Sequence, residues 1–333
     1  RYFIMNWLDI VGHENNIKLL KGMLDKDAVP HALLFVGPEG IGKFQLAKVL
    51  AKTLLCPKVA SSCQDCQQCL VEPVDQNIDL VIIKPDNDVI KIEQVRKLQQ
   101  DLILGPHKAK RKVIIIDNAD KMTVQTANSL LKTLEEPANN IIFILIATKP
   151  EALLDTIKSR CQIMNFQPIS PNILEKYLVN EKGVSLAEAA VVSRVSGGRI
   201  SKALELLSED GLIMRKLAFK IVNALPKMRK TEVWEYGNKV VELERSQIVE
   251  LLVHVKMLLR DILILHYDEQ DTLLYNIDLT AELKEQIKYW SDYHLVWVQK
   301  EIARSIQAIE ANANLKLIIE AMLIKVIDEL QRR

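Results

Sequence analysis

Residues 31–50, HALLFVGPEGIGKFQLAKVL, decide the fold of this chain. The apolar run Ala32–Val36 predicts a buried strand, residues 37–43 predict a tight glycine-rich loop, and apolar residues at helical spacing predict a helix after it. This order is the layout of a phosphate-binding loop, in which backbone N–H groups, a lysine and a helix N-terminus surround a phosphate. The candidate nucleotide-binding residues in the loop are Gly37, Gly40, Gly42 and Lys43.

The last position of the loop departs from the pattern. A phosphate-binding loop has Ser or Thr after the lysine, because that hydroxyl binds Mg²⁺, whereas this chain has Phe44. The glycines and Lys43 are sufficient to retain the loop shape, so binding of ATP or ADP without hydrolysis stays open.

The composition limits the broad class of protein. A chain of 333 residues, 49% of them hydrophobic, is long enough for two or three domains with real cores. Lys and Arg (44) nearly balance Asp and Glu (43), so any nucleic-acid contact must come from a local patch. Because neither a signal-peptide pattern nor a long apolar run is found, we expect a cytoplasmic protein with no membrane span.

Four cysteines lie within fourteen residues after the loop helix, and the last three form C-x-x-C-x-x-C. In a reducing compartment such spacing favours metal binding over disulfides, and four thiolates close a tetrahedral Zn²⁺ shell. The alternative is three incidental loop thiols and one on a helix. The candidate ligands of a structural zinc are Cys56, Cys63, Cys66 and Cys69.

Strands alternate with helices up to residue 166. Strand patterns at 79–83, 113–116, 141–147 and 163–166 are separated by helical patterns such as 91–104 and 126–135. This alternation predicts an α/β fold with a doubly wound parallel sheet, whose phosphate site lies at the carboxyl ends of the strands.

Asp117 follows the most apolar of these runs, Val113–Ile116, and so lies at the predicted phosphate edge. An acid here is the Walker B position, which holds Mg²⁺ in ATPases. The alternative role is to cap a helix. The next residue in an ATPase is Glu, which activates water, but here it is Asn118, which cannot accept a proton.

The character of the chain changes at residue 168. Residues 168–333 contain many helical periods and almost no strand pattern. We divide the chain into 1–167, which includes the cysteine module at 56–69, a small helical domain at 168–208, and a helical bundle at 209–333.

A basic turn precedes the strand at 113–116 and is a candidate DNA contact. Four charges in so short a segment are also typical of a solvated turn. The residues concerned are Lys108, Lys110, Arg111 and Lys112.

Several motifs occur in one order along the chain. The loop is followed by the cysteines, by LLKTLEEP at 130–137, by Ser-Arg-Cys at 159–161 and by Gly-Gly-Arg at 197–199. In this the chain resembles the bacterial clamp-loader AAA+ subunits of DNA polymerase III, over essentially its whole length. The resemblance implies an AAA+ module, a helical lid and a helical collar, in a five-subunit ring with gamma/tau and delta subunits. The ring loads the sliding clamp on primer-template DNA.

The resemblance also assigns roles to individual residues. Arg160 matches the arginine finger that reaches the ATP site of the adjacent subunit; its alternative role is a surface ion pair. Thr148 matches the sensor-1 position and Arg199 the sensor-2 position.

Phe44 and Asn118 remove two parts of the hydrolysis apparatus while Arg160 is retained. This favours a stator type of subunit, not an enzyme on its own, which completes a neighbour's ATP site within the polymerase holoenzyme. The alternatives are a gamma/tau-type ATPase of the same complex and an AAA+ module that binds ATP and DNA without hydrolysis.

Overall fold

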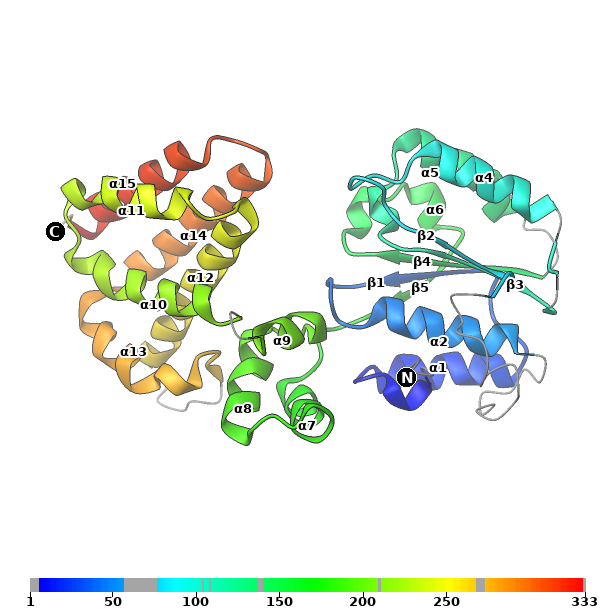
Figure 1. The fold of residues 1–333 in the computed structure, drawn as a ribbon, viewed down its shortest axis with the longest axis horizontal. Coiled ribbons are helices and arrows are strands. Elements are labelled where there is room, and N and C mark those ends of the chain that lie inside the picture. The colour runs from blue at the N-terminus through cyan, green and yellow to red at the C-terminus, as the bar shows by residue number, and fades with distance from the viewer. Residues whose placement is uncertain are drawn as a thin grey trace. The chain divides into compact units, whose positions relative to one another are not determined.

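The computed structural model describes residues 6–56, 77–103, 105–107, 109–136, 140–208, 211–267 and 273–331. The chain forms two compact units (Figure 1). The first comprises residues 1–177 and 198–202, and the second comprises residues 178–197 and 203–333.

The first unit contains a parallel sheet with strand order β2-β3-β4-β1-β5. In β1, Leu34 pairs with Leu145 of β4 on one side and with Ile163 of β5 on the other, which places the strand before the phosphate loop inside the sheet. The strands are β1 (Ala32–Val36), β2 (Leu80–Ile83), β3 (Lys112–Ile116), β4 (Ile141–Ala147) and β5 (Gln162–Asn165).

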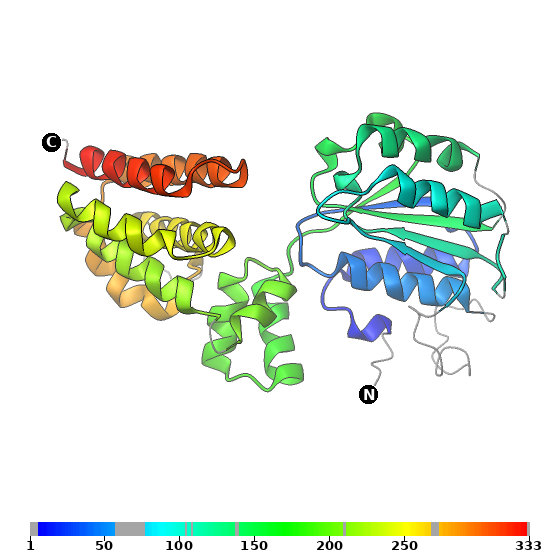
Figure 2. The same ribbon diagram turned by 45° about the horizontal axis from the view of Figure 1, so that its top comes forward.

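Helices cover both faces of this sheet (Figures 1 and 2). Successive residues of a strand point to opposite faces, so Leu33 and Phe35 pack in one apolar cluster and Leu34 in the other. The first cluster includes residues of α1 (Glu14–Asp25) and α2 (Lys43–Leu55). The second includes residues of α4 (Ile92–Ile103), α5 (Val124–Glu135) and α6 (Asp155–Lys158). The expected doubly wound α/β fold is confirmed.

The second unit is helical. Its core is built from apolar stripes on the helices, and the stripe of α12 is buried at Leu251, Leu252, Val255, Leu258, Leu259 and Ile262. Its helices are α8 (Leu186–Val195), α10 (Ile213–Ala224), α11 (Val233–Val241), α12 (Arg245–Tyr267), α13 (Thr280–Gln286), α14 (Asp292–Glu310) and α15 (Leu315–Gln331). Helices α7 (Pro171–Lys182) and α9 (Ile200–Leu206) each have residues in both units. Among the described helices, none is long and apolar enough to cross a membrane.

Short 3₁₀ helices complete the described elements. They are η1 (Trp7–Asp9), η3 (Ala119–Lys121), η4 (Pro150–Ala152), η5 (Leu225–Lys227), η6 (Lys230–Glu232), η8 (Ile277–Leu279) and η9 (Ile287–Tyr289).

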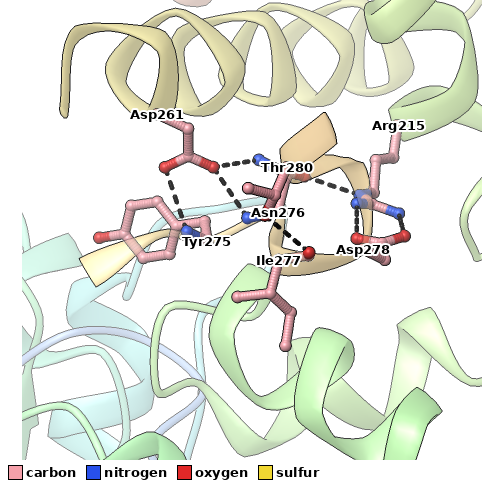
Figure 3. Close-up of polar contacts among 7 residues, drawn as sticks. All are labelled: Arg215, Asp261, Tyr275, Asn276, Ile277, Asp278 and Thr280. Carbon is pink, nitrogen blue, oxygen red and sulfur yellow. Dashed lines mark hydrogen bonds and ion pairs between the residues drawn. The ribbon is translucent and has the colours of Figure 1, made fainter. Parts of the chain in front are cut away.

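A buried polar cluster joins the segment after α12 to two helices of the second unit (Figure 3). Asp261 of α12 accepts hydrogen bonds from the backbone N–H of Tyr275 (3.1 Å) and from the backbone and side-chain N–H of Asn276 (2.8 and 2.7 Å). Arg215 of α10 donates to Asn276 Oδ1 (2.8 Å) and to both oxygens of Asp278 (3.0 and 2.5 Å). The buried acceptors and donors of this cluster are therefore paired within the chain.

Candidate functional site

The topology brings the predicted phosphate-site residues together at the carboxyl ends of the strands. Gly37 follows β1, Asp117 follows β3 and Thr148 follows β4, and these three strands are neighbours. The backbone N–H of Gly37 donates to Ala147 O of β4 (3.2 Å). Ligands of open parallel sheets bind at such carboxyl ends, so the edge is a candidate phosphate site.

Gly40 packs against the first turn of α9. Its carbonyl accepts hydrogen bonds from the N–H (3.1 Å) and the hydroxyl (3.3 Å) of Ser201. The φ of Gly40 is +76°, a conformation that favours glycine, and a Cβ here would lie 2.0 Å from Ser201 Oγ, so the hydroxyl would have to rotate away and lose its hydrogen bond. Arg199, the sensor-2 candidate, immediately precedes this helix and thereby lies next to the loop.

Lys43 is a buried cation, only 5% exposed. Its Nζ donates to Gly37 O (2.5 Å) and Pro38 O (2.6 Å), so the lysine links the end of the loop to its beginning. Burial lowers the pKa of the ammonium, while the negative charges of Asp117, Asp120 and Glu39 oppose that shift. An incoming phosphate would replace the two carbonyl oxygens as the acceptor of these N–H groups.

Asp117 is half-buried beside the loop. Burial raises the pKa of its carboxyl above the ordinary value, because burial penalises the charged form, and the positive charges of Lys84 and Lys43 oppose that shift. The cap position of η3 is taken by Asn118, in a left-handed conformation, so Asp117 is not the cap of this short helix.

Asp120 is a further member of this edge. Its two carboxylate oxygens accept from the backbone N–H groups of Thr148 (3.1 Å) and Lys149 (3.2 Å), which fixes the segment after β4. Sequence reasoning missed this role, although the Asp-Asn-Ala-Asp spacing after β3 was a usable signal.

Phe44 and Lys84 form a pair at the place where a metal ion is expected. Lys84 Nζ lies 4.6 Å from the centroid of the Phe44 ring, and Lys48 Nζ lies 5.8 Å from it. Phe44 presents a ring in place of a metal-binding hydroxyl, and Lys84 adds a positive charge beside Asp117. These residues do not fit Mg²⁺, whose ligands are oxygens. Sequence reasoning missed Lys84, because only the fold brings it to Phe44.

Arg160 lies on the turn between α6 and β5. One terminal nitrogen, Nη1, donates to Thr156 O (2.8 Å) and Ser159 Oγ (3.3 Å), and the other, Nη2, contacts Glu135 Oε1 at 2.5 Å. One third of its side chain is exposed. The fold thus joins two of the sequence motifs, since Glu135 belongs to LLKTLEEP and Arg160 to Ser-Arg-Cys. The neighbouring Cys161 is largely buried, which raises the pKa of its thiol to about 11.

The zinc candidates fall mostly outside the described residues. Cys56 ends α2 and is buried, whereas Cys63, Cys66 and Cys69 belong to the segment that is not described. The zinc site therefore stays a prediction.

The four basic residues of the turn do not form one surface patch. Lys112 is buried in β3, where its Nζ donates to Asp101 O (2.9 Å). Arg111 forms an ion pair with Asp27. Lys110 is exposed, and Lys108 lies outside the described residues. A DNA contact through this turn would therefore use fewer charges than the sequence suggests.

Comparison with known proteins places the chain in a family. The family described as "DNA polymerase III, delta subunit" matches residues 12–170. The chain is 32% identical over 273 residues to the DNA polymerase III subunit delta' of Bacillus subtilis, which covers 81% of this chain and 82% of the relative. Subunit tau of the same organism is 31% identical over 208 residues, covering 60% of this chain and 37% of the relative.

A similar solved structure is a gamma subunit-related DNA polymerase III protein from Thermotoga maritima, at 17% identity and a TM-score of 0.43, covering 95% of this chain and 99% of that one. The sequence match to the Bacillus subtilis delta' subunit spans most of both proteins. The chain therefore belongs to the family of DNA polymerase III delta' subunits.

Proposed function

We propose that this chain is a stator subunit of the bacterial clamp loader, which does not hydrolyse ATP and completes the ATP site of a neighbouring subunit with Arg160. The observation that carries the proposal is the combination of a partly exposed, anchored Arg160 with a loop that has Phe44 and Asn118 at two positions needed for hydrolysis.

The anchoring of Arg160 suits an arginine finger. A guanidinium has five N–H donors, and three hydrogen bonds within the chain hold Arg160 on its turn. Two N–H groups therefore stay available, as far as the described residues go. A planar cation held in this way can neutralise charge that develops on the transferred phosphoryl oxygens of ATP without having to be ordered first.

The chain's own loop supports a role without turnover. Phe44 supplies no oxygen for a metal ion and the Asn118 amide cannot accept a proton from water. A gamma/tau-type ATPase would need both functions, so the structure offers it less support than the stator role.

A stator subunit of this kind would have defined partners and one cofactor. Gamma/tau and delta subunits would share the five-subunit ring, and the complex would act on the sliding clamp and primer-template DNA. The four cysteines at 56–69 would hold a structural zinc. The ring would function in the cytoplasm.

The first experiment measures the complex reconstituted with Arg160→Ala. Arginine fingers contribute on the order of 10³–10⁵ to the rate at their site. We expect an assembled complex with a lower ATPase rate and slower clamp loading. Arg160→Lys retains the charge but not the fork of donors, so most of the loss should persist. Arg96→Ala, at an exposed arginine of α4, is the matched control and should change neither rate. An unchanged ATPase in the Arg160→Ala complex would refute the finger.

The second experiment measures ATP hydrolysis by the isolated chain. We expect no turnover above background, with or without Mg²⁺. Turnover that Lys43→Ala abolishes would show that the loop is an ATPase site and would overturn the stator role.

A further inference from the structure

We infer that the phosphate loop of this chain binds a nucleoside polyphosphate without a divalent metal, because the Lys84 ammonium takes the place of the magnesium ion. The inference goes beyond the proposed function, since it concerns the chain's own loop and does not depend on Arg160.

The sheet places Lys84 beside the acid that would otherwise hold the metal. Ile83 of β2 pairs with Ile116 of β3, so the next residues, Lys84 and Asp117, leave the sheet side by side. The backbone is fixed at this point, because Asp117 N–H donates to Ile83 O (2.9 Å) and Gln94 Nε2 donates to Lys84 O (2.9 Å).

The ring of Phe44 contacts the ammonium of Lys84, an exposed lysine whose charge also acts on Asp117. Lys84 Nζ lies 4.6 Å from the ring centroid, within the range of a cation–π contact. Phe44 is the second residue of α2, at the point where a hydroxyl would bind the metal. Phe44 therefore removes a metal-binding hydroxyl from the loop and at the same time offers an aromatic face that a cation can contact.

An ammonium can supply part of what the metal supplies, namely positive charge at the phosphate oxygens. In related loops the metal bridges phosphate oxygens and neutralises their charge. An ammonium also neutralises charge and donates three N–H bonds to phosphate oxygens. Lys43 and Lys84 would approach the phosphates from different elements, α2 and the end of β2. A divalent ion beside Asp117 would be repelled by Lys84, so the site selects the phosphate chain without its metal.

The test uses ADP binding by the purified full chain, measured by calorimetry in EDTA and in Mg²⁺. We expect dissociation constants that agree within about twofold, and Lys84→Ala should weaken binding about tenfold or more in both buffers. Lys97→Ala, at an exposed lysine of α4, is the control and should bind as the parent does. Absence of binding in both buffers, binding that needs Mg²⁺, or an unaffected Lys84→Ala variant would each overturn the inference.

A double variant provides an independent test. Phe44→Ser with Lys84→Ala restores the hydroxyl and removes the ammonium, so ADP binding should become stronger in Mg²⁺ than in EDTA. Circular dichroism checks that the variant is folded. Binding that is absent or indifferent to Mg²⁺ would contradict the assignment. None of these outcomes bears on Arg160, whose role is tested by the ATPase of the complex.

Discussion

Two carboxyl groups, one in each unit, differ in their surroundings: Asp261 is buried and Asp117 is half-buried. Asp261 of the helical unit accepts three N–H bonds and lies beside Arg260. Asp117 at the sheet edge faces the charges of Lys84 and Lys43 but forms no ion pair with them closer than 4 Å among the described contacts. Burial raises the pKa of both. The carboxyl of Asp261 is thus paired directly with buried N–H groups, whereas the carboxyl of Asp117 interacts with its cationic neighbours only through their charge.

The largest expected difference is in stability. Asp261→Ala removes the acceptor of buried N–H groups that cost about 1–3 kcal/mol each when unpaired, so we expect a loss of roughly 3 kcal/mol. Asp117→Ala should change stability by less than about 1 kcal/mol, because Asp117 accepts fewer such bonds. Urea unfolding followed by circular dichroism and tryptophan fluorescence measures both, with Asp25→Ala, at an exposed aspartate of α1, as control. Equal losses for Asp261→Ala and Asp117→Ala would break the comparison.

A smaller loss of stability, equal in the two units, is expected when a helix N-cap is removed from either of them. Thr123 caps α5 by accepting from Thr126 N–H (3.1 Å), and Ser291 caps α14 by accepting from His294 N–H (3.2 Å). Replacing either with alanine should cost about 1 kcal/mol in urea unfolding. Thr123→Ser keeps the hydroxyl and should cost less than Thr123→Ala. If Thr123→Ser loses as much stability as Thr123→Ala, the loss is not caused by removal of the helix cap.

The smallest expected effect is the pH dependence of stability that comes from Asp117. It is small because Asp117 is half-exposed and solvent screens its charge. Its folded pKa is raised, so the charged form destabilises the fold at neutral pH and this penalty disappears below the ordinary pKa of aspartate. Asp117→Asn should therefore be more stable than the parent at neutral pH and equal to it at about pH 3. Asp88 has a pKa lowered by its hydrogen bond to Lys121, so Asp88→Asn should show the opposite sign at neutral pH. Unfolding curves across pH that give both variants the same sign would contradict this reading.

Much of the fold followed from local patterns in the sequence. The strands Ala32–Val36 and Ile141–Ala147 have the predicted bounds, because both are continuous apolar runs buried on two faces. Strand β5 runs from Gln162 to Asn165, one residue earlier than its apolar pattern. Its position is set by pairing with β1, where Gln162 is opposite Leu33.

The candidate site was only partly predictable, because its key contacts join distant parts of the chain. Lys84 meets Phe44, and Glu135 meets Arg160, through the fold alone. The basic turn was misleading for the same reason. Buried Asp79 accepts from the N–H groups of His107 (2.6 Å) and Ala109 (2.7 Å), which shapes the turn and directs Lys112 into the sheet.

The contact between Gly40 and Ser201 has a mechanical consequence. Helix α9 starts in the first unit and continues into the second, and its first turn is held by the carbonyl of a loop glycine. Because Ser201 donates two hydrogen bonds to this carbonyl, a displacement of the loop at Gly40 would move the first turn of α9 with it. The start of α9 is thus held by a backbone carbonyl of a loop residue that has no side chain.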